Sequence, residues 1–530
     1  MTRTSYPSWT RVVWPLLAVL LLCTVLAAAA HAGPVVLDDQ DWRGPDLVAE
    51  ADGVEYNLIS SLLLYTEMRE PVFLFDPTED ETITTITDFR GKLYLGSCTR
   101  PSDTDTGSVF TYDPETHAWE KVFQVNEQGL VRLEVYGDRL YIPGYDANDG
   151  DWDLGNIYVH DGESWVEHRT VPRAVHIYGL AVYRGRIYVS ADVLDEPPPG
   201  ESVEEAYKEG LIGIHGGVMS SADGGLTWRE EHRGLGQDAG FMTVFDDRLI
   251  VNAGGDLLTF DGHAWQQLGL NPNALVVLDY VPAGQSLLLG TSVGLAVFDG
   301  GKLQPLDRWE GMGHQIRAIR RFGERWIVVS NFIAGGTLRH GPGGTGYMNL
   351  KDDEEKPFIS WLKVMPEVFF RATVLLDEQA QQELREHGMS EFPRWIYCGE
   401  MLVSAHAFKG RLFLGTHPDG RVLVLPVATE GTLDAAPRAL AQPGKYVLSW
   451  EAATPEGTSC GLQVRSAPDL ASLNDAPFTG PDGEADNLYE ASGAIIEIPD
   501  AGFVQYRVVM KTENPALSPY LKRVTLRAAD

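Results

Sequence analysis

A short pattern of polar and apolar positions returns seven times along this chain of 530 residues. Each copy starts with a small, charged or polar residue, continues with a basic or polar one, and ends in an apolar run. Such runs predict β-strands, in which neighbouring side chains point to opposite faces. The copies are GKLYLGS, DRLYIPG, GRIYVSA, DRLIVNA, QSLLLGT, ERWIVVS and GRLFLGT, which begin at Gly91, Asp138, Gly185, Asp247, Gln285, Glu324 and Gly410.

Each copy also has the same neighbours. An alternating strand precedes it, as in VRLEVY and IYGLAVY, and a glycine-led strand with an Asp-Gly or Asp-Pro turn follows, as in GNIYVHDGESW. Four strands in about 40–47 residues are typical of one β-propeller blade. The pattern therefore predicts an all-β chain with a seven-bladed β-propeller over residues 70–430.

The seventh unit supplies only three strands, so the ring needs one more. The stretch EPVFLFDP, residues 70–77, precedes the first unit and alternates like a strand. We expect it to complete the last blade, because closure leaves no sheet edge exposed.

Other segments fall outside the repeat. Two insertions, about 191–216 and 336–394, interrupt it, and the second contains a predicted helix over 378–387 with Asp377 as N-cap and Gly388 as C-cap. Alternating runs from 445 onward, separated by Asp, Gly and Pro turns, predict a small accessory β-sandwich over 431–530. Residues 33–69 are interpreted as an N-terminal lead-in.

The first 32 residues predict a signal peptide. Arg3 and Arg11 precede an apolar run over 12–30, and Ala30 and Ala32 flank a small-x-small cleavage pattern. An uncleaved anchor is the alternative, since the run is long enough to span a bilayer. We expect a secreted, periplasmic or cell-surface protein that is not inserted in the membrane after cleavage.

The formal net charge of −33 limits the classes of molecule that the protein is expected to bind. Nucleic acids and anionic membrane surfaces bind clustered Lys and Arg, so neither is expected. A solvated acidic surface fits, as does a protein that handles neutral sugars or cations. We expect a monomer. Downstream of the signal peptide only Cys98, Cys398 and Cys460 remain, which is no disulfide framework. Cys98 and Cys398 would lie in neighbouring blades of a closed ring and could pair.

The stretch SADGGLTW, from Ser221 to Trp228, matches S-x-D-x-G-x-T-W and occupies the turn before the fourth strand of its unit. It resembles the Asp-box (BNR) repeats of sialidase-type and other glycan-active propellers, and YDPETHAW resembles kelch-type blades. The resemblance implies an exported, carbohydrate-associated propeller whose box is structural and lies away from the substrate. A FRIP-like segment and a spaced arginine triad are missing, so a sialidase is not expected.

Propeller ligands bind over the central channel, on the face built by the loops that enter each innermost strand. There His176 and Tyr178 could abstract and donate protons in polysaccharide β-elimination, with an arginine nearby. A hydrolase would instead need two carboxylates about 5–10 Å apart. His176 could also be a structural residue bonded to a neighbouring carbonyl. The candidate catalytic residues are His176, Tyr178, His314, Arg317, Asp238 and Glu400, with Arg132 as a substrate-binding residue.

The loop over 144–156, GYDANDGDWDLGN, is the most unusual in the chain. Clustered oxygen ligands suit Ca²⁺, although the spacing is not that of an EF-hand and a solvated turn is the alternative. Trp152 could stack on a sugar ring, and Tyr145 of the same loop is a further candidate substrate-binding residue. The candidate calcium ligands are Asp146, Asn148, Asp149, Asp151 and Asp153.

Two functions remain open from the sequence. The first is an enzyme acting on an extracellular polysaccharide, as a lyase or a glycoside hydrolase, with its site over the channel. The second is a non-catalytic carbohydrate- or protein-binding scaffold at the cell surface. Nucleotide and redox cofactors are not indicated, because no P-loop or dinucleotide fingerprint stands in a usable context. Converging acid and base groups would favour the enzyme, and dispersed or paired-off groups the scaffold.

Overall fold

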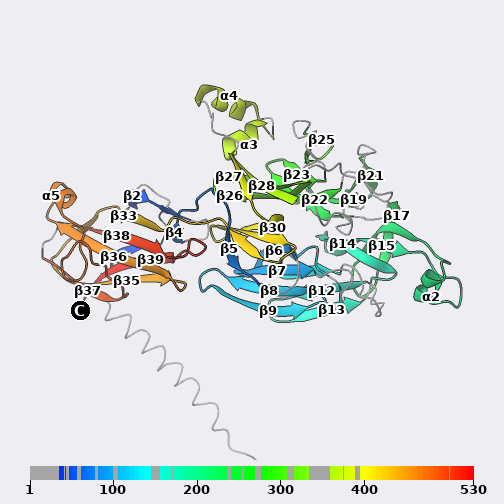
Figure 1. Cartoon of the computed structure of the whole chain (residues 1–530), viewed down its shortest axis with the longest axis horizontal. Helices are drawn as coiled ribbons and strands as arrows, with labels where there is room; N and C mark the ends of the chain where they lie inside the picture. Colours follow the sequence, from blue (N-terminus) through cyan, green and yellow to red (C-terminus); the bar gives the residue numbers. More distant parts are fainter. Residues whose placement is uncertain are drawn as a thin grey trace, which may run out of the picture. The chain divides into compact units, whose positions relative to one another are not determined.

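The structure of the protein is a computed structural model (Figure 1). It describes residues 35–529 apart from 41, 43–46, 57–60, 78–81, 99–105, 128, 145–154, 170, 236–239, 254–255, 269–275, 293, 307–314, 334–357, 374, 376, 388–393 and 500–501. The chain divides into two compact units. One comprises residues 66–427, and the other combines the segment before residue 66 with residues 428–530.

The described part of unit 66–427 contains seven four-stranded antiparallel sheets, named sheets 1 to 7 in chain order. Sheets 1 to 4 are β6 (Thr82–Phe89), β7 (Lys92–Cys98), β8 (Ser108–Asp113), β9 (Ala118–Gln124); β10 (Glu134–Tyr136), β11 (Arg139–Pro143), β12 (Asn156–His160), β13 (Trp165–Arg169); β14 (Ala174–Tyr183), β15 (Arg186–Leu194), β16 (Ile214–Ser221), β17 (Arg229–Leu235); and β18 (Met242–Phe245), β19 (Arg248–Ala253), β20 (Asp256–Phe260), β21 (Trp265–Gln267). Sheets 5 to 7 are β22 (Val277–Ala283), β23 (Ser286–Thr291), β24 (Gly294–Phe298), β25 (Leu303–Pro305); β26 (Gln315–Phe322), β27 (Arg325–Ile333), β28 (Phe358–Pro366), β29 (Arg394–Cys398); and β30 (Met401–Phe408), β31 (Arg411–His417), β32 (Val422–Val424), β5 (Val72–Phe75).

The predicted pairing of the 70–77 stretch with the last unit is confirmed. Strand β5 lies antiparallel to β32, with Val72 opposite Val424 and Phe75 opposite Val422. Three strands of sheet 7 thus come from one end of the unit and the fourth from the other. This pairing ties the two ends of the unit together with backbone hydrogen bonds.

Apolar side chains fill the space between each sheet and the next. Leu93 and Leu95 are fully buried, and their equivalents in the other copies of the repeat are buried apart from Ile187, which is partly buried; this is why the alternating phrases are strongly apolar. Six buried apolar clusters join each sheet to the next, from sheet 1 through sheet 7.

Sheet 7 in turn packs against sheet 1. The ring centroids of Phe413 and Tyr112 lie 5.6 Å apart, and Ser404 Oγ donates to the carbonyl of Ile83 at 2.6 Å. Lys409 Nζ also contacts Glu115 Oε1 at 2.7 Å, with both side chains mostly buried. Each sheet therefore packs against the next one in the chain, and the last packs against the first.

Aspartates shape the turns between third and fourth strands. Asp223, in the SADGGLTW stretch, accepts hydrogen bonds from the Thr227 hydroxyl (2.6 Å) and from the amides of Leu226 and Thr227. The hydroxyl of Thr227 and these amides hold the pKa of Asp223 well below its usual range. The stretch joins β16 to β17, as predicted. Equivalent carboxylates that accept backbone amides are those of Asp113, Asp161, Asp261 and Asp299.

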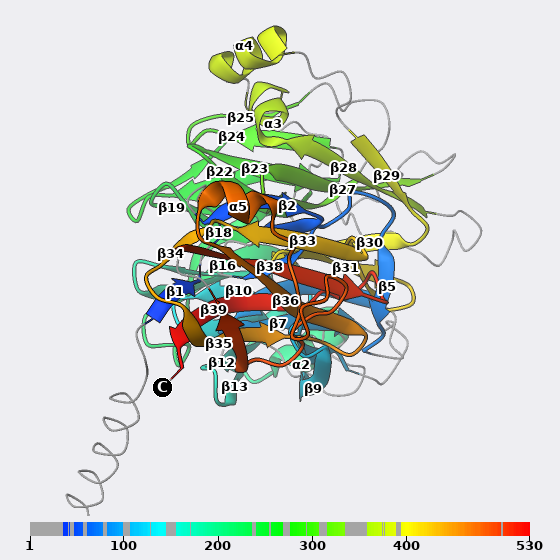
Figure 2. The ribbon, with the colours of Figure 1, turned by 90° about the vertical axis from the view of Figure 1, so that its left-hand side faces the viewer.

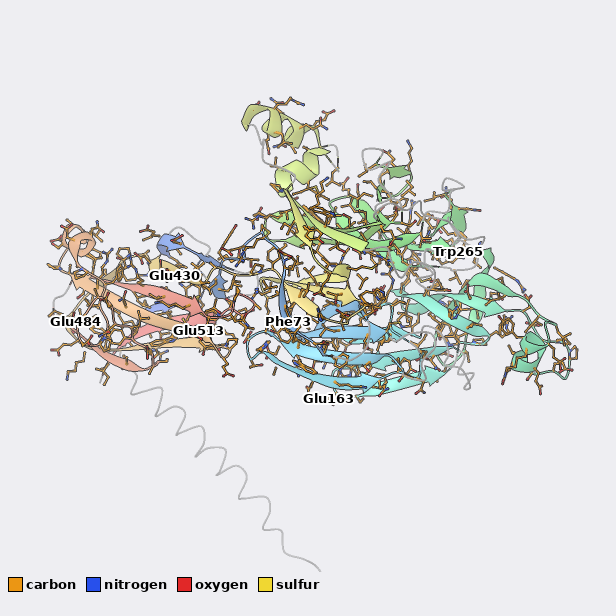
Figure 3. All side chains as sticks on the ribbon, viewed as in Figure 1. Phe73, Glu163, Trp265, Glu430, Glu484 and Glu513 are labelled. Atoms are coloured by element: carbon orange, nitrogen blue, oxygen red, sulfur yellow. The ribbon has the colours of Figure 1, made fainter. Side chains whose placement is uncertain are left out.

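Two tryptophans that end these turns stack on aromatic neighbours; one of them, Trp265, is labelled in Figure 3. Trp265 stacks on Phe260 at 4.8 Å within sheet 4 and lies 5.4 Å from the ring of His232 on sheet 3. Trp165 of sheet 2 stacks on Phe123 of sheet 1 at 4.5 Å. The aromatic residue after each turn thus adds apolar contact between sheets.

The prediction that residues 336–394 form an insertion was partly wrong. Residues 336–394 include β28, the third strand of sheet 6, followed by α3 (Glu367–Thr373) and α4 (Glu378–His387). The long connection before β28 breaks the spacing of the repeat, so the strand is hidden in sequence. Helix α4 has the predicted bounds, and Asp377 Oδ1 accepts the amide of Ala380 at 3.1 Å. The first insertion carries α2 (Val203–Lys208).

The unit formed with residues 428–530 consists of two sheets (Figure 2). Their strands are β1 (Val35–Asp39), β3 (Val54–Tyr56), β4 (Leu62–Leu64), β35 (Gly444–Ala453), β37 (Ala494–Ile498) and β39 (Tyr520–Ala528) in one, and β2 (Val48–Asp52), β33 (Glu430–Ala435), β34 (Arg438–Leu440), β36 (Thr458–Ala467) and β38 (Gly502–Thr512) in the other; α5 (Leu470–Asp475) follows β36.

The interpretation of residues 33–69 as a lead-in was wrong. Strands β1 to β4 belong to the two sheets of this unit, and β1 pairs with β39. Tyr506 donates to Asp39 at 2.7 Å, and Trp42 Nε1 donates to the Tyr506 hydroxyl at 2.9 Å. Strands β3 and β4 pair with each other, but β1, β2 and β4 pair with strands hundreds of residues away, which leaves no local sign of the pairing in the sequence.

Candidate functional site

The first strands of five sheets share one irregularity. In each, the register with the second strand shifts at a residue that has no residue opposite it in the ladder, and β14 has a second such shift at Val175. Such bulges bend a strand and redirect a side chain, and they often lie beside functional sites. The bulge residues are Thr84, Tyr178, Leu278, Arg317 and Val403.

In sheet 3 the bulge brings three polar side chains together. The hydroxyl of Tyr178 donates to Asp192 Oδ2 at 2.9 Å. His176 Nδ1 lies 3.4 Å from the same oxygen and 3.3 Å from the Tyr178 hydroxyl. Asp192, on β15, is buried, whereas a quarter of the His176 side chain is exposed. Two predicted residues therefore converge on a carboxylate that the sequence analysis did not single out.

This geometry sets the tautomer of His176. The single proton of the Tyr178 hydroxyl points to Asp192, so Nδ1 of His176 faces two oxygens that accept. A hydrogen on Nδ1 satisfies both contacts, which leaves the lone pair of the neutral ring on Nε2. In this tautomer Nε2 can accept a proton and the Tyr178 hydroxyl can donate one, while both rings contact Asp192.

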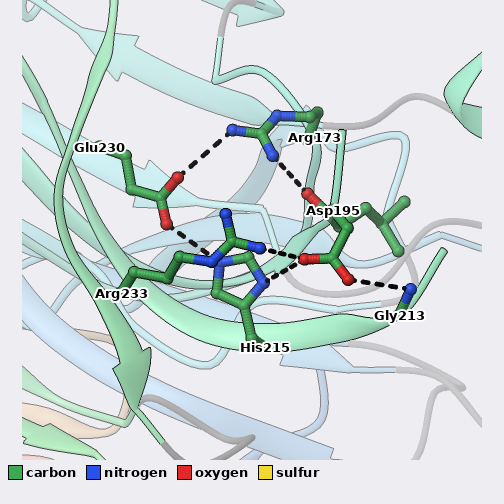
Figure 4. A network of polar contacts seen from close by, with 7 residues as sticks. Arg173, Asp195, Gly213, His215, Glu230 and Arg233 are labelled. Atoms are coloured by element: carbon green, nitrogen blue, oxygen red, sulfur yellow. Dashed lines mark hydrogen bonds and ion pairs between the residues drawn. The ribbon is translucent and has the colours of Figure 1, made fainter. Parts of the chain in front are cut away.

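A chain of polar contacts crosses the same sheet (Figure 4). His215 Nε2 lies 3.0 Å from Glu230 Oε1, and His215 Nδ1 lies 3.3 Å from Asp195 Oδ1. Arg173 and Arg233 extend the chain at its two ends, to Glu230 and Asp195 respectively. These residues come from the start of β14, from β16 and β17, and from the residue after β15.

The network also holds the backbone that leads to His176. Arg173 has a φ of +63°, which a residue with a side chain adopts at a cost. Its guanidinium donates to the carbonyl of Leu194 at 2.7 Å, and its own carbonyl accepts the Leu194 amide at 2.8 Å. Contacts of this kind over-determine the entry to β14 and make the site rigid.

A second cluster joins sheet 2 to sheet 5. The Tyr280 hydroxyl lies 3.3 Å from both carboxylate oxygens of Glu134. Arg132 donates to the carbonyl of Leu278 at 3.3 Å and stacks over the Tyr280 ring at 5.6 Å. Burial raises the pKa of Glu134 to about 7, against the opposing effect of Arg132, and burial also raises the pKa of Tyr280. Sequence reasoning missed Glu134, although its alternation with Arg132 and Tyr136 marks a polar face.

The remaining predicted residues have separate surroundings. Glu400 lies between β29 and β30 and accepts from Arg421 Nη1 at 3.2 Å, so it belongs to an ion pair of sheet 7. Arg317 is the bulge residue of sheet 6. Cys98 and Cys398 are not joined by a disulfide. The predicted residues outside the described part are His314, Asp238, Tyr145, Trp152, Asp146, Asn148, Asp149, Asp151 and Asp153.

Two searches over the described residues returned nothing. No group of three or more His, Cys, Asp or Glu among them is placed to hold a metal ion. No helix in the described part of the chain combines the length and apolar character that crossing a membrane requires.

Comparison with known proteins gives structural likenesses alone. No family model matches the chain, and no curated protein does. Among solved structures the chain is similar to the extracellular domain of a hybrid two-component system from B. thetaiotaomicron, at 9% identity and a TM-score of 0.40. The match covers 68% of this chain and 40% of that one, so this chain spans about two fifths of its length.

Proposed function

We propose that residues 66–427 form a seven-bladed β-propeller of an exported protein. The closed order of packing supports this, because seven sheets that each pack on the next must surround a centre. The contacts of Arg132 with Leu278 and of Glu134 with Tyr280 support it further, since they join sheets three places apart. Export is inferred from the apolar, Arg-flanked N-terminal sequence.

The propeller acts on an extracellular polysaccharide, by elimination, at the channel end of sheet 3. The observation that carries this function is the shared oxygen of Asp192, which receives the Tyr178 hydroxyl and faces His176 Nδ1. An isolated structural histidine bonded to a carbonyl would not need a phenol and a carboxylate at the same point. Paired acid and base groups beside one another are what elimination requires.

The chemistry follows from the tautomer. Nε2 of His176 takes the proton from the carbon next to a sugar carboxylate, and that electron pair forms a carbon–carbon double bond. The bond between the neighbouring carbon and the glycosidic oxygen breaks, and the oxygen takes the proton of the Tyr178 hydroxyl. His176 returns its proton to the tyrosinate through solvent or by direct contact, while Asp192 keeps both rings in place.

Hydrolysis has less support than elimination. It needs two carboxylates that face the scissile bond with space between them. Asp192 is occupied by Tyr178 and Glu400 by Arg421, whereas Asp238 lies outside the described residues. A non-catalytic carbohydrate-binding scaffold would use the same face, and the paired ions of Figure 4 are compatible with it. Calcium at the acidic loop over 146–153 stays a proposal.

The test is a screen of polysaccharides with the purified exported protein, with and without EDTA. Ultraviolet absorbance of unsaturated uronate and new reducing ends are followed together. We expect both signals from wild type and from Tyr183→Phe, a control on the same strand whose hydroxyl donates to the Asp247 carbonyl at 2.7 Å. Both should disappear in His176→Ala and fall in Tyr178→Phe.

Other outcomes would redirect the assignment. Reducing ends without absorbance would indicate hydrolysis and contradict the elimination mechanism. Retention on a glycan without any product would indicate the binding scaffold. Loss of activity in EDTA would support calcium at the acidic loop.

A further inference from the structure

Sheet 6 repeats the positions of the sheet 3 site with different side chains. His176 lies opposite Asp192 in the register of β14 and β15, two residues before the bulge at Tyr178. Gln315 lies opposite Asn331 in the register of β26 and β27, two residues before the bulge at Arg317. The group Gln315, Arg317 and Asn331 is therefore the counterpart of His176, Tyr178 and Asp192.

The amide of Gln315 is buried and makes no hydrogen bond to any described residue. The residue is only 2% exposed, and neither its amide oxygen nor its amide nitrogen has a hydrogen-bond partner among the described residues. Its neighbour Asn331 differs, since it donates to the Leu402 carbonyl at 2.9 Å and accepts from Ser360 Oγ at 2.7 Å. A buried amide with both ends unmatched is unfavourable and calls for an explanation such as a ligand.

Sheets three places apart lie within reach of one another at the level of the bulge. Arg132 of sheet 2 donates directly to the carbonyl of Leu278, which is the bulge residue of sheet 5. Sheets 3 and 6 are also three places apart in the packing order. A single sugar residue between them could therefore touch Tyr178 on one side and Arg317 on the other.

We infer that Gln315 and Arg317 form a carboxylate-binding subsite, so that the sugar held against His176 and Tyr178 is an acidic one. A guanidinium matches the two oxygens of a carboxylate, and an amide N–H adds a third donor. A chain with a net charge of −33 would repel an acidic glycan elsewhere, so a local cation decides where it binds. When the guanidinium neutralises the sugar carboxylate, the proton on the neighbouring carbon also becomes easier to remove. The catalytic part of this inference rests on the proposed function, whereas the binding part does not.

The experiment compares oligomers of galacturonic acid with their methyl esters by titration calorimetry. Esterification removes the charge and keeps the sugar. We expect wild type to bind the acid at least about tenfold more tightly than the ester, the range that a charged hydrogen bond gives. Arg317→Gln and Gln315→Met should both lose this preference.

Two controls separate binding from folding. Arg321→Gln changes an exposed arginine of the same strand, whose Nε lies 3.6 Å from Glu367, and should keep the preference. Gln315→Met removes two unmatched polar atoms, so its melting temperature without ligand should equal or exceed that of wild type. A clear fall in that temperature would mean that the amide has a structural partner and would overturn the inference.

The failures of the two proposals are distinguishable. Equal binding of acid and ester, no binding of the acid, or an unchanged preference in Arg317→Gln each overturns the subsite. Preferential binding of the acid without unsaturated product overturns elimination and leaves the subsite standing. If Arg317→Gln forms unsaturated product at the wild-type rate, the subsite is overturned and elimination stands.

Discussion

Replacement of Glu134 by glutamine tests how the centre of the large unit is built. Glu134 is 14% exposed and lies between Tyr280, at 3.3 Å, and Arg132, at 4.0 Å. Burial raises its pKa from 4.5 to about 7, and the charges of Arg132, Asp279 and Arg320 act on it as well. The folded protein therefore favours the protonated acid, which glutamine imitates in shape and charge.

The magnitude follows from linkage. Each pKa unit corresponds to about 1.4 kcal/mol, so a rise of this size corresponds to about 3 kcal/mol. Because the folded pKa is raised, the wild type has its full stability below pH about 4.5 and loses it as the pH rises through about 7. The variant has no titrating group there. Its free energy of unfolding relative to wild type should thus increase by about 3 kcal/mol between pH about 4 and 8.

Urea unfolding at a series of pH values, followed by tryptophan fluorescence, measures this difference. Glu120→Gln is the matched control, because it makes the same substitution at a side chain that is two-thirds exposed on β9. A difference for Glu134→Gln that does not change with pH would refute the reasoning. It would mean one of two things. Either water reaches the Glu134 carboxylate between sheets 2 and 5, or the charge of Arg132 fully compensates the cost of burying it.

Three further substitutions examine the closure, the turns and the site. Lys409→Met removes the contact between sheets 7 and 1 and should lower the free energy of unfolding by about 1–2 kcal/mol, with little salt dependence because Lys409 and Glu115 are mostly buried; no change in urea midpoint would show that the contact is dispensable. Gly162→Ala combines a φ of +99° with a clash against the Arg90 guanidinium, whereas Gly137→Ala at φ +63° meets open space, so thermal melts should rank the first as less stable by about 1 kcal/mol or more. Equal melts would contradict that packing. Tyr178→Phe should reduce the rate of product formation by about 100-fold or more while KM stays near wild type, because the variant loses the proton donor and its hydrogen bond to Asp192 but keeps the ring; an equal change in KM and kcat would point to binding instead.

The local patterns predicted much of the fold because their causes are local. Alternation buries every second side chain, so the strands and the pairing of β5 with the last unit follow from period and count. Asp223 and Asp377 act on amides within four residues, so the turn and the start of α4 are visible in sequence. The missed strand β28 and the strands β1 to β4 lack such signs, since a long insertion or a distant partner separates them from what they pair with.

The candidate site divides in the same way. The sequence by itself placed His176 and Tyr178 two residues apart on one predicted strand and put Arg317 in another copy of the repeat. Only the tertiary structure decided that Asp192 meets both His176 and Tyr178, that Gln315 and Arg317 take the matching positions in sheet 6, and that Glu134 meets Tyr280 of a sheet three places away. It also decided that the amide of Gln315 is buried without a hydrogen-bond partner among the described residues. The physical reason is range: periodicity reports burial along one strand, whereas hydrogen bonds and desolvation depend on atoms brought together from strands far apart in the chain.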